Sequence, residues 1–369
     1  MIKALDVQNF TALPNTTWSF ARGLNMVIGE NGLGKTHVLK LLYALLKVQA
    51  DTKNLSKGVL ERAYADKLIT VFRPESLGHL VKRRQGRGRC EVRLDMRNDG
   101  LSMAGAFASN AKSQIEILKA PTEGLERSPA YLPTQELVTL CPWFVPLYEN
   151  YHLEFEETWR DTVSLLGNPS LKGPREKRAA ELLEPLEKAM GGKVQVDTAS
   201  GRFYLQLPGE GRMEMPLVAE GLRKIAMLAR LISTGMLLEQ GYLFWDEPES
   251  NLNPKLIKIV AASIVAVAAN GVQVFVASHS LFLLRELEML LGDKRYQKLP
   301  RRWFSLAAKD GEVVLEQSDQ VQDIQTLVML DEELAQSDRF MLKQFDLKTT
   351  QRYANTSKMG RTRQMCYTH

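Results

Sequence analysis

The sequence is poor in cysteine and has no long apolar run, and each scarcity excludes a class of protein. Its cysteines, Cys90, Cys141 and Cys366, lie far apart, so neither a disulfide framework nor a metal-ligand spacing is present. No stretch of about 18 uncharged apolar residues occurs, which argues against a transmembrane helix. The opening residues MIKALDVQNF lack the apolar core of a signal peptide and are typical of a strand. We therefore expect a cytoplasmic protein without a membrane segment.

The bulk composition is that of an ordinary globular protein. Hydrophobic residues make up 44% of the chain and charged residues 25%, values that exclude a disordered or fibrous chain. The 369 residues are about twice the length of a typical domain, which leaves room for one large α/β core with an inserted lobe. The net charge of +5 permits contact with nucleic acid but does not by itself argue for it.

The clearest motif is GENGLGKTH, which has two glycines, a lysine and a threonine at the spacing of a phosphate-binding loop. An apolar run precedes it and leucines at helical spacing follow it, so we expect strand, loop and helix. Such a loop turns backbone N–H groups toward phosphate oxygens, and the helix adds the positive end of its dipole. A glycine-rich turn without a ligand is the alternative, against which this context argues. The expected nucleotide contacts are Gly29, Glu30, Asn31, Gly32, Leu33, Gly34, Lys35, Thr36 and His37.

Acidic residues follow a second apolar run, in YLFWDEPESN from Tyr242 to Asn251. The apolar residues predict a buried strand, and open α/β sheets bind ligands at the carboxyl ends of their strands. We expect Asp246 and Thr36 to hold Mg²⁺, while Lys35 reaches the β- and γ-phosphates. Glu247 is expected to orient and polarise the attacking water. A strand that ends in an acidic turn without a ligand is the alternative.

Two further segments flank this acidic strand. VFVASHS is an apolar strand ending at His279, one crossover after Glu247, so His279 can reach the γ-phosphate; a structural histidine is the alternative. LVAEGLRKIAML, from Leu217 to Leu228, is a small-residue turn that opens a helix and could bind an anion, although by itself it is only a helix start. The alternation of strands and helices here predicts a parallel sheet.

The rest of the chain predicts an insertion into this core. Alternating stretches between Cys90 and Leu118 predict antiparallel strands, and Val194–Leu207 is typical of a hairpin. An acidic, aromatic helical stretch is expected over 148–161, and a polar helix that ends near Gly191. Helices are also expected over Gly221–Glu239 and near 321–344.

Along the chain, the order of phosphate loop, signature-like helix, acidic strand with DEPESNLNP, and histidine resembles the ABC-type ATPase head. More closely it resembles bacterial AAA-family ATPases related to SMC proteins, to RecF and to the ATPase half of the overcoming-lysogenization-defect (OLD) nucleases, which often act in anti-phage defence. The resemblance covers residues 1–45, 130–165 and 215–290. It implies an α/β fold with a mostly parallel P-loop core sheet, an antiparallel β layer and an inserted helical lobe. The corresponding ranges are 1–50 and 215–345 for the ATPase core, 51–214 for the inserted β layer and helical lobe, and 346–369 for a basic C-terminal tail.

The resemblance also implies a Mg²⁺-dependent ATPase with composite sites, in which the signature turn of one subunit contacts the ATP of another. The residues it assigns are Ala219, Glu220 and Gly221 to the γ-phosphate of the partner's nucleotide, Asn251 and Asn253 to the loop that crosses the interface, and Gln135 to Mg²⁺ or water. The family often has serine where Ala219 stands and histidine where Asn253 stands. These departures bear on ATP-driven dimerisation more than on ATP binding.

Three charged segments each have two readings. KRRQGRGR, residues 82–89, is either a phosphate-backbone contact or a solvated loop. The basic tail 346–369 either binds a partner or nucleic acid, or is a mobile terminus. The acidic, aromatic stretch 148–161 is either a protein-docking face or a surface helix with a buried stripe.

Three functions are consistent with such an ATPase. The first is an ATP-driven dimerising switch, sensor or scaffold for a separately encoded nuclease or toxin in anti-phage defence, since only about 80 residues follow the core and OLD proteins need more for their nuclease. The second is a RecF-like DNA-binding ATPase in DNA repair, which the basic runs favour. The third is a transporter subunit, against which the separation of about 210 residues between Thr36 and Asp246 argues. We expect a homodimer or higher homo-oligomer through the ATP sites, with an effector protein as partner and nucleic acid as an alternative.

Overall fold

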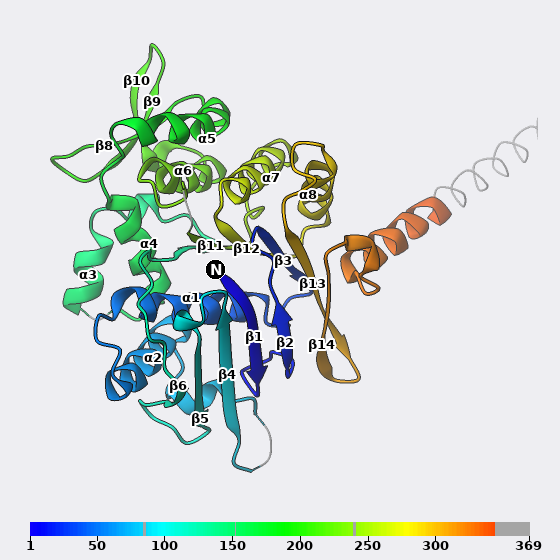
Figure 1. The fold of residues 1–369 in the computed structure, drawn as a ribbon. Helices are drawn as coiled ribbons and strands as arrows, with labels where there is room; N and C mark the ends of the chain where they lie inside the picture. The colour runs from blue at the N-terminus through cyan, green and yellow to red at the C-terminus, as the bar shows by residue number, and fades with distance from the viewer. Residues whose placement is uncertain (84–85, 152, 239–240, 344–369) are drawn as a thin grey trace, which may run out of the picture. The chain divides into compact units, whose positions relative to one another are not determined.

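The computed structural model describes residues 1–83, 86–151, 153–238 and 241–343 (Figure 1). Residues Met1–Thr326 form one compact unit, and the residues from Leu327 onward belong to a second. Two positions of the basic run 82–89 and the whole tail 346–369 lie outside the described residues, so the two readings of each segment stay open.

The central sheet of the first unit is the predicted parallel core. All neighbouring strands in it are parallel except the last two along the chain, which form an antiparallel hairpin. The strands that precede the two ligand motifs and the histidine are buried along their whole length, as expected for strands covered on both faces. In spatial order the strands are β14 (Glu312–Ser318), β13 (Arg301–Lys309), β3 (Leu24–Gly29), β12 (Gln273–Ser278), β11 (Tyr242–Asp246) and β7 (Ala130–Leu132).

The second sheet is the predicted antiparallel layer. Its strands in spatial order are β2 (Thr16–Ser19), β1 (Ile2–Gln8), β4 (Arg89–Met96), β5 (Met103–Ala108) and β6 (Glu116–Lys119). Side chains of β4 alternate between exposed and buried, so one face of the strand packs on the core and the other meets solvent. This sheet joins residues 2–19 to residues 89–119, and the central sheet takes β7 from the middle of the chain. Each sheet thus combines strands from the range assigned to the ATPase core, 1–50 and 215–345, with strands from the range assigned to the insertion, 51–214.

The helices complete the α/β fold. They are α1 (Lys35–Asp51), α2 (Lys57–Phe72), α3 (Phe144–Tyr151), α4 (Glu157–Gly167), α5 (Pro174–Met190), α6 (Glu220–Ser233), α7 (Pro254–Ala269) and α8 (Leu281–Gly292). Short 3-10 turns lie at Leu77–Leu80, Asp99–Leu101, Val138–Leu140, Met215–Leu217 and Val321–Asp323. α5 packs against α6 and α7, and β8 (Lys193–Val196), β9 (Phe203–Leu207) and β10 (Gly211–Glu214) form a small antiparallel sheet beside them. The predicted hairpin over 194–207 is therefore confirmed and is extended by a third strand.

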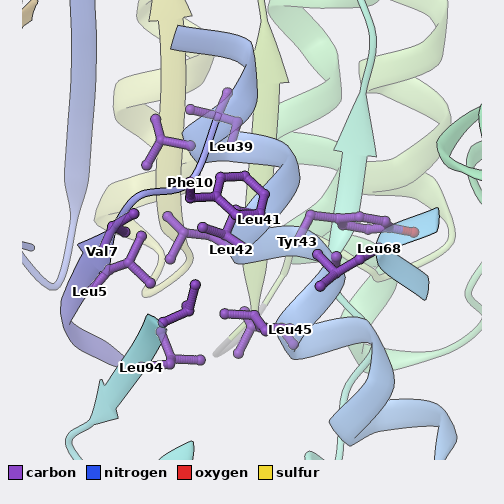
Figure 2. Close-up of a cluster of buried hydrophobic side chains, with 14 of the residues drawn as sticks. Leu5, Val7, Phe10, Leu39, Leu41, Leu42, Tyr43, Leu45, Leu68 and Leu94 are labelled. Atoms are coloured by element: carbon purple, nitrogen blue, oxygen red, sulfur yellow. The ribbon is translucent and has the colours of Figure 1, made fainter. Parts of the chain in front are cut away.

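Helix α1, which follows the phosphate loop, is buried between the two large sheets. On one side Leu42 and Leu45 pack against Leu5 of β1 and Leu94 of β4 (Figure 2). On the other side, the ring of Tyr43 lies edge-on to Tyr131, with 5.4 Å between centroids. A helix whose middle, Leu41–Leu46, is buried at every residue belongs in such a place. Burial of each leucine contributes about 1.5–3 kcal/mol, so the start of α1 is held firmly.

Two predicted helices differ from those observed. α6 ends at Ser233 instead of Glu239, because Gly235 adopts a φ of 83° and lets the N–H of Met236 close onto the carbonyl of Leu231 at 3.1 Å. The stretch 148–161 is broken between α3 and α4. There the Phe155 ring stacks on Trp159 with 5.2 Å between centroids, and the Glu156 carboxylate pairs with Lys40 of α1. The ion pair with Lys40 comes from a distant helix and holds Glu156 just before the start of α4.

The predicted helix near 321–344 is also divided. A short turn at Val321–Asp323 closes the first unit, and residues 328–343 of the second unit are helical. Among the described residues, no helix is both long enough and apolar enough to cross a membrane.

Candidate functional site

The loop between β3 and α1 has the conformation that its glycines predict. A Cβ on Gly29 would lie 2.4 Å from the carbonyl oxygen of Leu306 in β13, so only glycine fits there. Gly34 has a φ of 98° and caps α1 without a side chain, which leaves the first N–H groups of the helix available to an anion. Asn31 is exposed, and a Cβ on Gly32 would meet no described atom within 4 Å. The rim of the loop is therefore open.

Lys35 occupies the centre of this loop. Its Nζ donates to the carbonyl oxygens of Gly29 and Glu30, both at 2.8 Å, and the residue is only 6% exposed. Burial lowers the pKa of this ammonium, while the nearby carboxylates of Glu247 and Asp246 oppose the shift. A buried cation with only neutral oxygens as direct partners is well placed to bind phosphate.

The other side chains of the motif differ in their surroundings. Leu33 is buried, whereas Glu30 is exposed beside the open rim. The ring of His37 is engaged elsewhere, with Nδ1 2.9 Å from the hydroxyl of Thr11 and a T-shaped contact with the Phe72 ring at 5.6 Å between centroids. Burial lowers the pKa of His37, which favours the neutral ring. Of the predicted nucleotide contacts, His37 thus has its side chain already engaged and offers only its backbone.

Thr36 and Asp246 meet although they are far apart in sequence. The Thr36 hydroxyl donates to Oδ2 of Asp246 at 2.8 Å. The other carboxylate oxygen, Oδ1, is buried and has no hydrogen-bonding partner among the described atoms. Burial raises the pKa of Asp246 to about 6, which shows how poorly its negative charge is compensated. Hydroxyl and carboxylate oxygens are ligands that Mg²⁺ prefers, so this pair fits a magnesium ion.

Gln135 opens into the same space as Asp246. Both line a cavity of about 280 Å³ together with Lys40 and Tyr131. The Tyr131 hydroxyl is also buried without a partner among the described atoms. Gln135 itself is exposed and follows the end of β7. The structure therefore places Gln135 at the mouth of the cavity beside the predicted metal ligand.

Glu247 and His279 form a pair at the carboxyl ends of β11 and β12. Nδ1 of His279 lies 3.0 Å from Oε1 of Glu247, and Oε2 of Glu247 accepts the Ser250 hydroxyl at 3.3 Å. Glu247 adopts a φ of 45°, which is uncommon for a residue with a side chain. Its backbone is held there because its N–H donates to the carbonyl of Ala277 at 2.9 Å. A carboxylate fixed in this way can orient a water molecule.

The sequence analysis did not identify Lys224 and Glu249, whose side chains hold the turn that follows β11. Lys224 is 2% exposed, and its Nζ donates to the carbonyl oxygens of Glu247 at 2.5 Å and Ser250 at 3.4 Å. Burial lowers its pKa to about 8, against the attraction of four carboxylates. Glu249 accepts the Ser278 hydroxyl at 2.6 Å and so ties the turn to β12. A lysine on the buried face of an amphipathic helix was the signal that could have identified Lys224.

The signature turn lies at the surface and contacts the turn after β11. Ala219 and Glu220 are exposed at the start of α6, and alanine offers no side-chain cap. Asn251, with a φ of 62°, donates to the Glu220 carboxylate at 2.8 Å, and a Cβ on Gly221 would lie 2.7 Å from the carbonyl oxygen of Asn251. The structure thus brings together the residues assigned to the partner's nucleotide. Asn253 instead caps α7 by accepting the N–H of Leu256 at 3.0 Å.

A second basic residue of α6 reaches the other side of the site. Nε of Arg223 pairs with the Glu136 carboxylate at 2.9 Å, next to Gln135. Glu136 is 8% exposed at its side chain, so the pair is largely desolvated. Arg223 and Lys224 therefore tie the signature helix to Gln135 on one side and to Glu247 on the other.

Two family models adjoin along the chain. Residues 112–285 match a family described as "AAA domain, putative AbiEii toxin, Type IV TA system", and residues 1–115 match one described as AAA ATPase domain. A curated relative is the DNA double-strand break repair Rad50 ATPase of Methanococcus maripaludis, at 24% identity over 226 residues. That match covers 61% of this chain and 20% of the relative, so the chain spans about a fifth of the relative's length.

Solved structures show the same fold at low identity. One is an SMC head bound to the C-winged helix domain of ScpA, with a TM-score of 0.54, 10% identity, and coverage of 88% of this chain and 99% of that chain. Another is an Smc head with an extended coiled coil bound to the C-terminal domain of ScpA derived from Pyrococcus furiosus, with a TM-score of 0.54, 9% identity, and coverage of 92% and 99%. The predicted fold class, a P-loop α/β head with an added antiparallel sheet, is confirmed.

Proposed function

We propose that this chain, an ATPase of the ABC/SMC-like type, is a Mg²⁺-dependent switch that dimerises on ATP and controls a separately encoded effector protein. The observation that carries the proposal is that one chain has two separate features suited to phosphate, each of which would be half of a nucleotide site. One half is the phosphate loop with Thr36 and Asp246, and the other is the exposed helix start at Ala219. Two copies in a two-fold arrangement would complete two sites.

In the proposed site each residue has one task. The loop N–H groups and Lys35 would hold the phosphates, and Thr36 and Asp246 would hold Mg²⁺, which neutralises phosphate charge when bound. Glu247 orients the water that attacks the γ-phosphate, and His279 holds Glu247 in place and senses the same phosphate. The N–H groups at the start of α6 would bind the γ-phosphate of the partner's ATP. Hydrolysis would release this contact and reopen the dimer.

The effector part of the proposal has two supports. The description of the family matched over 112–285 names a toxin and a type IV toxin–antitoxin system, which is a setting of paired genes. The SMC heads of similar fold are bound to domains of another protein, ScpA. With these supports, the proposal is that this ATPase acts in bacterial anti-phage defence, with a nuclease or a toxin as the output.

DNA repair is the second candidate, and the similarity to a Rad50 ATPase favours it. In that case DNA would stimulate ATP hydrolysis, and the stimulation would fall steeply with added salt because phosphate contacts release counterions. An effector switch would instead keep the same hydrolysis rate with and without DNA.

One capture experiment separates the two candidates. Tagged Glu247→Gln chain, expressed in its native host, would be captured in Mg²⁺-ATP and compared with a Glu247→Gln/Ala219→Asp chain that cannot dimerise. A stoichiometric protein from an adjacent gene that is bound only by the first chain is the expected result. Nuclease-sensitive DNA without a protein would instead overturn the effector switch in favour of DNA repair.

A mixing experiment tests the composite site. Ala219→Asp puts a negative charge where the partner's γ-phosphate would bind, and Lys35→Ala disables the phosphate loop, so each variant alone should be inactive. Each mixed dimer has one complete site of two. A 1:1 mixture should therefore recover up to roughly half of the normal ATPase rate if only mixed dimers form, and roughly a quarter if the chains pair at random. The measurement is the steady-state rate of phosphate release against the mixing ratio.

The stability of Ala219→Asp serves as a control for this experiment. Aspartate is a good N-cap, so Ala219→Asp should stabilise α6 by about 0.5–2 kcal/mol and should not lower the melting temperature. A mixture of Lys35→Ala with unchanged chain shows whether one complete site suffices for turnover. If that reference is active and the mixture of the two variants is not, the signature turn does not act on the partner's nucleotide.

Lys224 should affect turnover without affecting binding. In Lys224→Met the carbonyl of Glu247 loses its ammonium donor, so the turn that holds Glu247 at positive φ should loosen. We expect kcat to fall by roughly tenfold to a hundredfold, while the Kd of ATP stays within about threefold. The control is Lys255→Met, an exposed lysine in the first turn of α7. A matching rise in Kd would show that Lys224 serves nucleotide binding instead.

A further inference from the structure

A second cavity lies at the end of the central sheet opposite the phosphate loop. Its volume is about 570 Å³, and it is lined by residues around the amino ends of β3 and β13. The N–H of Leu24 donates to the carbonyl of Pro300 at 3.0 Å, which fixes these two ends side by side. Since Leu24 and Gly29 are the two ends of β3, this cavity is separate from the nucleotide site by the length of a strand.

The charged residues around this cavity are nearly all arginines. Arg22 follows β2, Arg97 follows β4, and Arg301 and Arg302 begin β13, whereas Asp319 is the one acidic residue in the lining of this cavity. These segments come from both large sheets. The fold therefore brings four arginine residues from three separate segments to one cavity.

Two of these guanidinium groups repel one another. In the described part of the chain neither Arg22 nor Arg97 has a side-chain hydrogen bond or an ion pair. The pKa of Arg97 is lowered first by partial burial and next by the positive charge of Arg22. Like charges held together in this way destabilise the empty site, and a bound anion would reverse that cost.

The other two arginines are only partly satisfied. Nη1 of Arg302 pairs with Asp319 at 2.9 Å, but its Nε is buried without a partner among the described atoms. Nη1 of Arg301 reaches the carbonyl oxygens of Leu291 and Gln297 at only 3.5 and 3.4 Å, which is the limit of a hydrogen bond. The contacts of these two arginines thus use Nη1 of each side chain and leave other N–H groups without a partner among the described atoms.

We propose that this cavity binds a phosphorylated small molecule of nucleotide size. The planar fork of a guanidinium matches two oxygens of a phosphate, and four forks exceed what a single phosphate group needs. The volume is in the range of small-molecule sites. A concave site built from separate loop ends suits a compact ligand better than the backbone of a nucleic-acid duplex, which is contacted along an extended surface.

The test uses pyrophosphate as probe and a chain with Lys35→Ala, so that the phosphate loop does not contribute. Isothermal titration should show binding to this chain, and adding Arg22→Ala and Arg97→Ala should weaken it by roughly tenfold or more. The matched control, Lys294→Ala/Lys298→Ala, removes the same charge from exposed neighbours that do not line the cavity, and should bind as before. Since repulsion is relieved, the arginine variant should melt no lower than its parent.

Several results would overturn this assignment. Absence of pyrophosphate binding is one, and equal weakening by the arginine and lysine variants is another, since it would indicate only general screening. A labelled DNA duplex that binds through Arg22 and Arg97 when pyrophosphate does not would identify a nucleic-acid contact instead. If the alanine variant fails to fold, Arg22→Gln/Arg97→Gln provides the same test. None of these outcomes depends on ATP hydrolysis, so the effector switch can fail independently.

Discussion

Replacing Glu247 with glutamine is expected to lower the turnover of ATP by roughly a hundredfold to ten-thousandfold, while ATP binding stays close to normal. The carboxylate is held by Ser250 and His279 at the carboxyl end of β11, where a general base must be fixed to act. Glutamine keeps the shape and can still bond to these neighbours, but it cannot take a proton from water. Phosphate release under saturating Mg²⁺-ATP measures the first effect, and ATP titration the second.

The same variant should remain dimeric in ATP, because the step that reopens the dimer is slowed. Glu210→Gln, an exposed change in the turn between β9 and β10, is the matched control and should behave as the unchanged chain does. An undiminished rate in Glu247→Gln would show that Glu247 is not the residue that activates water.

Replacing Lys35 with alanine is expected to weaken ATP binding by roughly a hundredfold or more. The ammonium is enclosed by the loop and would be the main positive charge on the phosphates. Its loss also removes both hydrogen bonds to the carbonyl oxygens of Gly29 and Glu30, so the loop loses the contact that shapes it. Equilibrium binding of a fluorescent ATP analogue measures the effect, and no ATP-dependent dimer should form.

Two controls separate this effect from misfolding. Lys53→Ala removes an exposed lysine after the end of α1 and should leave ATP affinity unchanged. The melting temperature of Lys35→Ala without nucleotide should be close to normal, since a buried ammonium with a lowered pKa is not itself a source of stability. Tight ATP binding by a folded Lys35→Ala chain would contradict the assignment of the loop.

The two variants together distinguish binding from hydrolysis as the signal. If ATP binding is the signal, Glu247→Gln should hold the effector in its controlled state permanently and Lys35→Ala should never reach it. If hydrolysis is the signal, both variants should fail in the same way. This comparison needs only an assay of the effector output in the presence of each variant.

Contacts between α6 and the candidate nucleotide site of the same chain would give the proposed switch a physical route. Arg223 pairs with Glu136 beside Gln135, and Lys224 holds the backbone of Glu247. A shift of Gln135 or Glu247 on binding ATP would therefore alter the position of the start of α6, which faces solvent. Through this helix the state of one site can bias the surface that a second copy would meet.

Local features of the sequence determined most of the elements and pointed to the residues of the candidate site. Strands β3, β11 and β12 are continuous apolar runs because both of their faces are covered, and that pattern is visible without coordinates. The phosphate loop is equally local, since its glycines and lysine act within nine residues of each other. Polar residues directly after apolar strands predicted that Asp246, Glu247 and His279 lie at one edge of the sheet, because parallel strands end on the same side.

Only the tertiary structure decided which side chains touch. Thr36 meets Asp246, and Lys224 reaches the carbonyl of Glu247, because the sheet order and the packing of α6 bring separate segments together. The break between α3 and α4 depends on contacts with α1 that no local period contains. The arginine-lined cavity is the extreme case, since each arginine alone is typical of a solvated surface. They lie together because three separate segments meet in space, and a linear sequence carries no local signal for such a meeting.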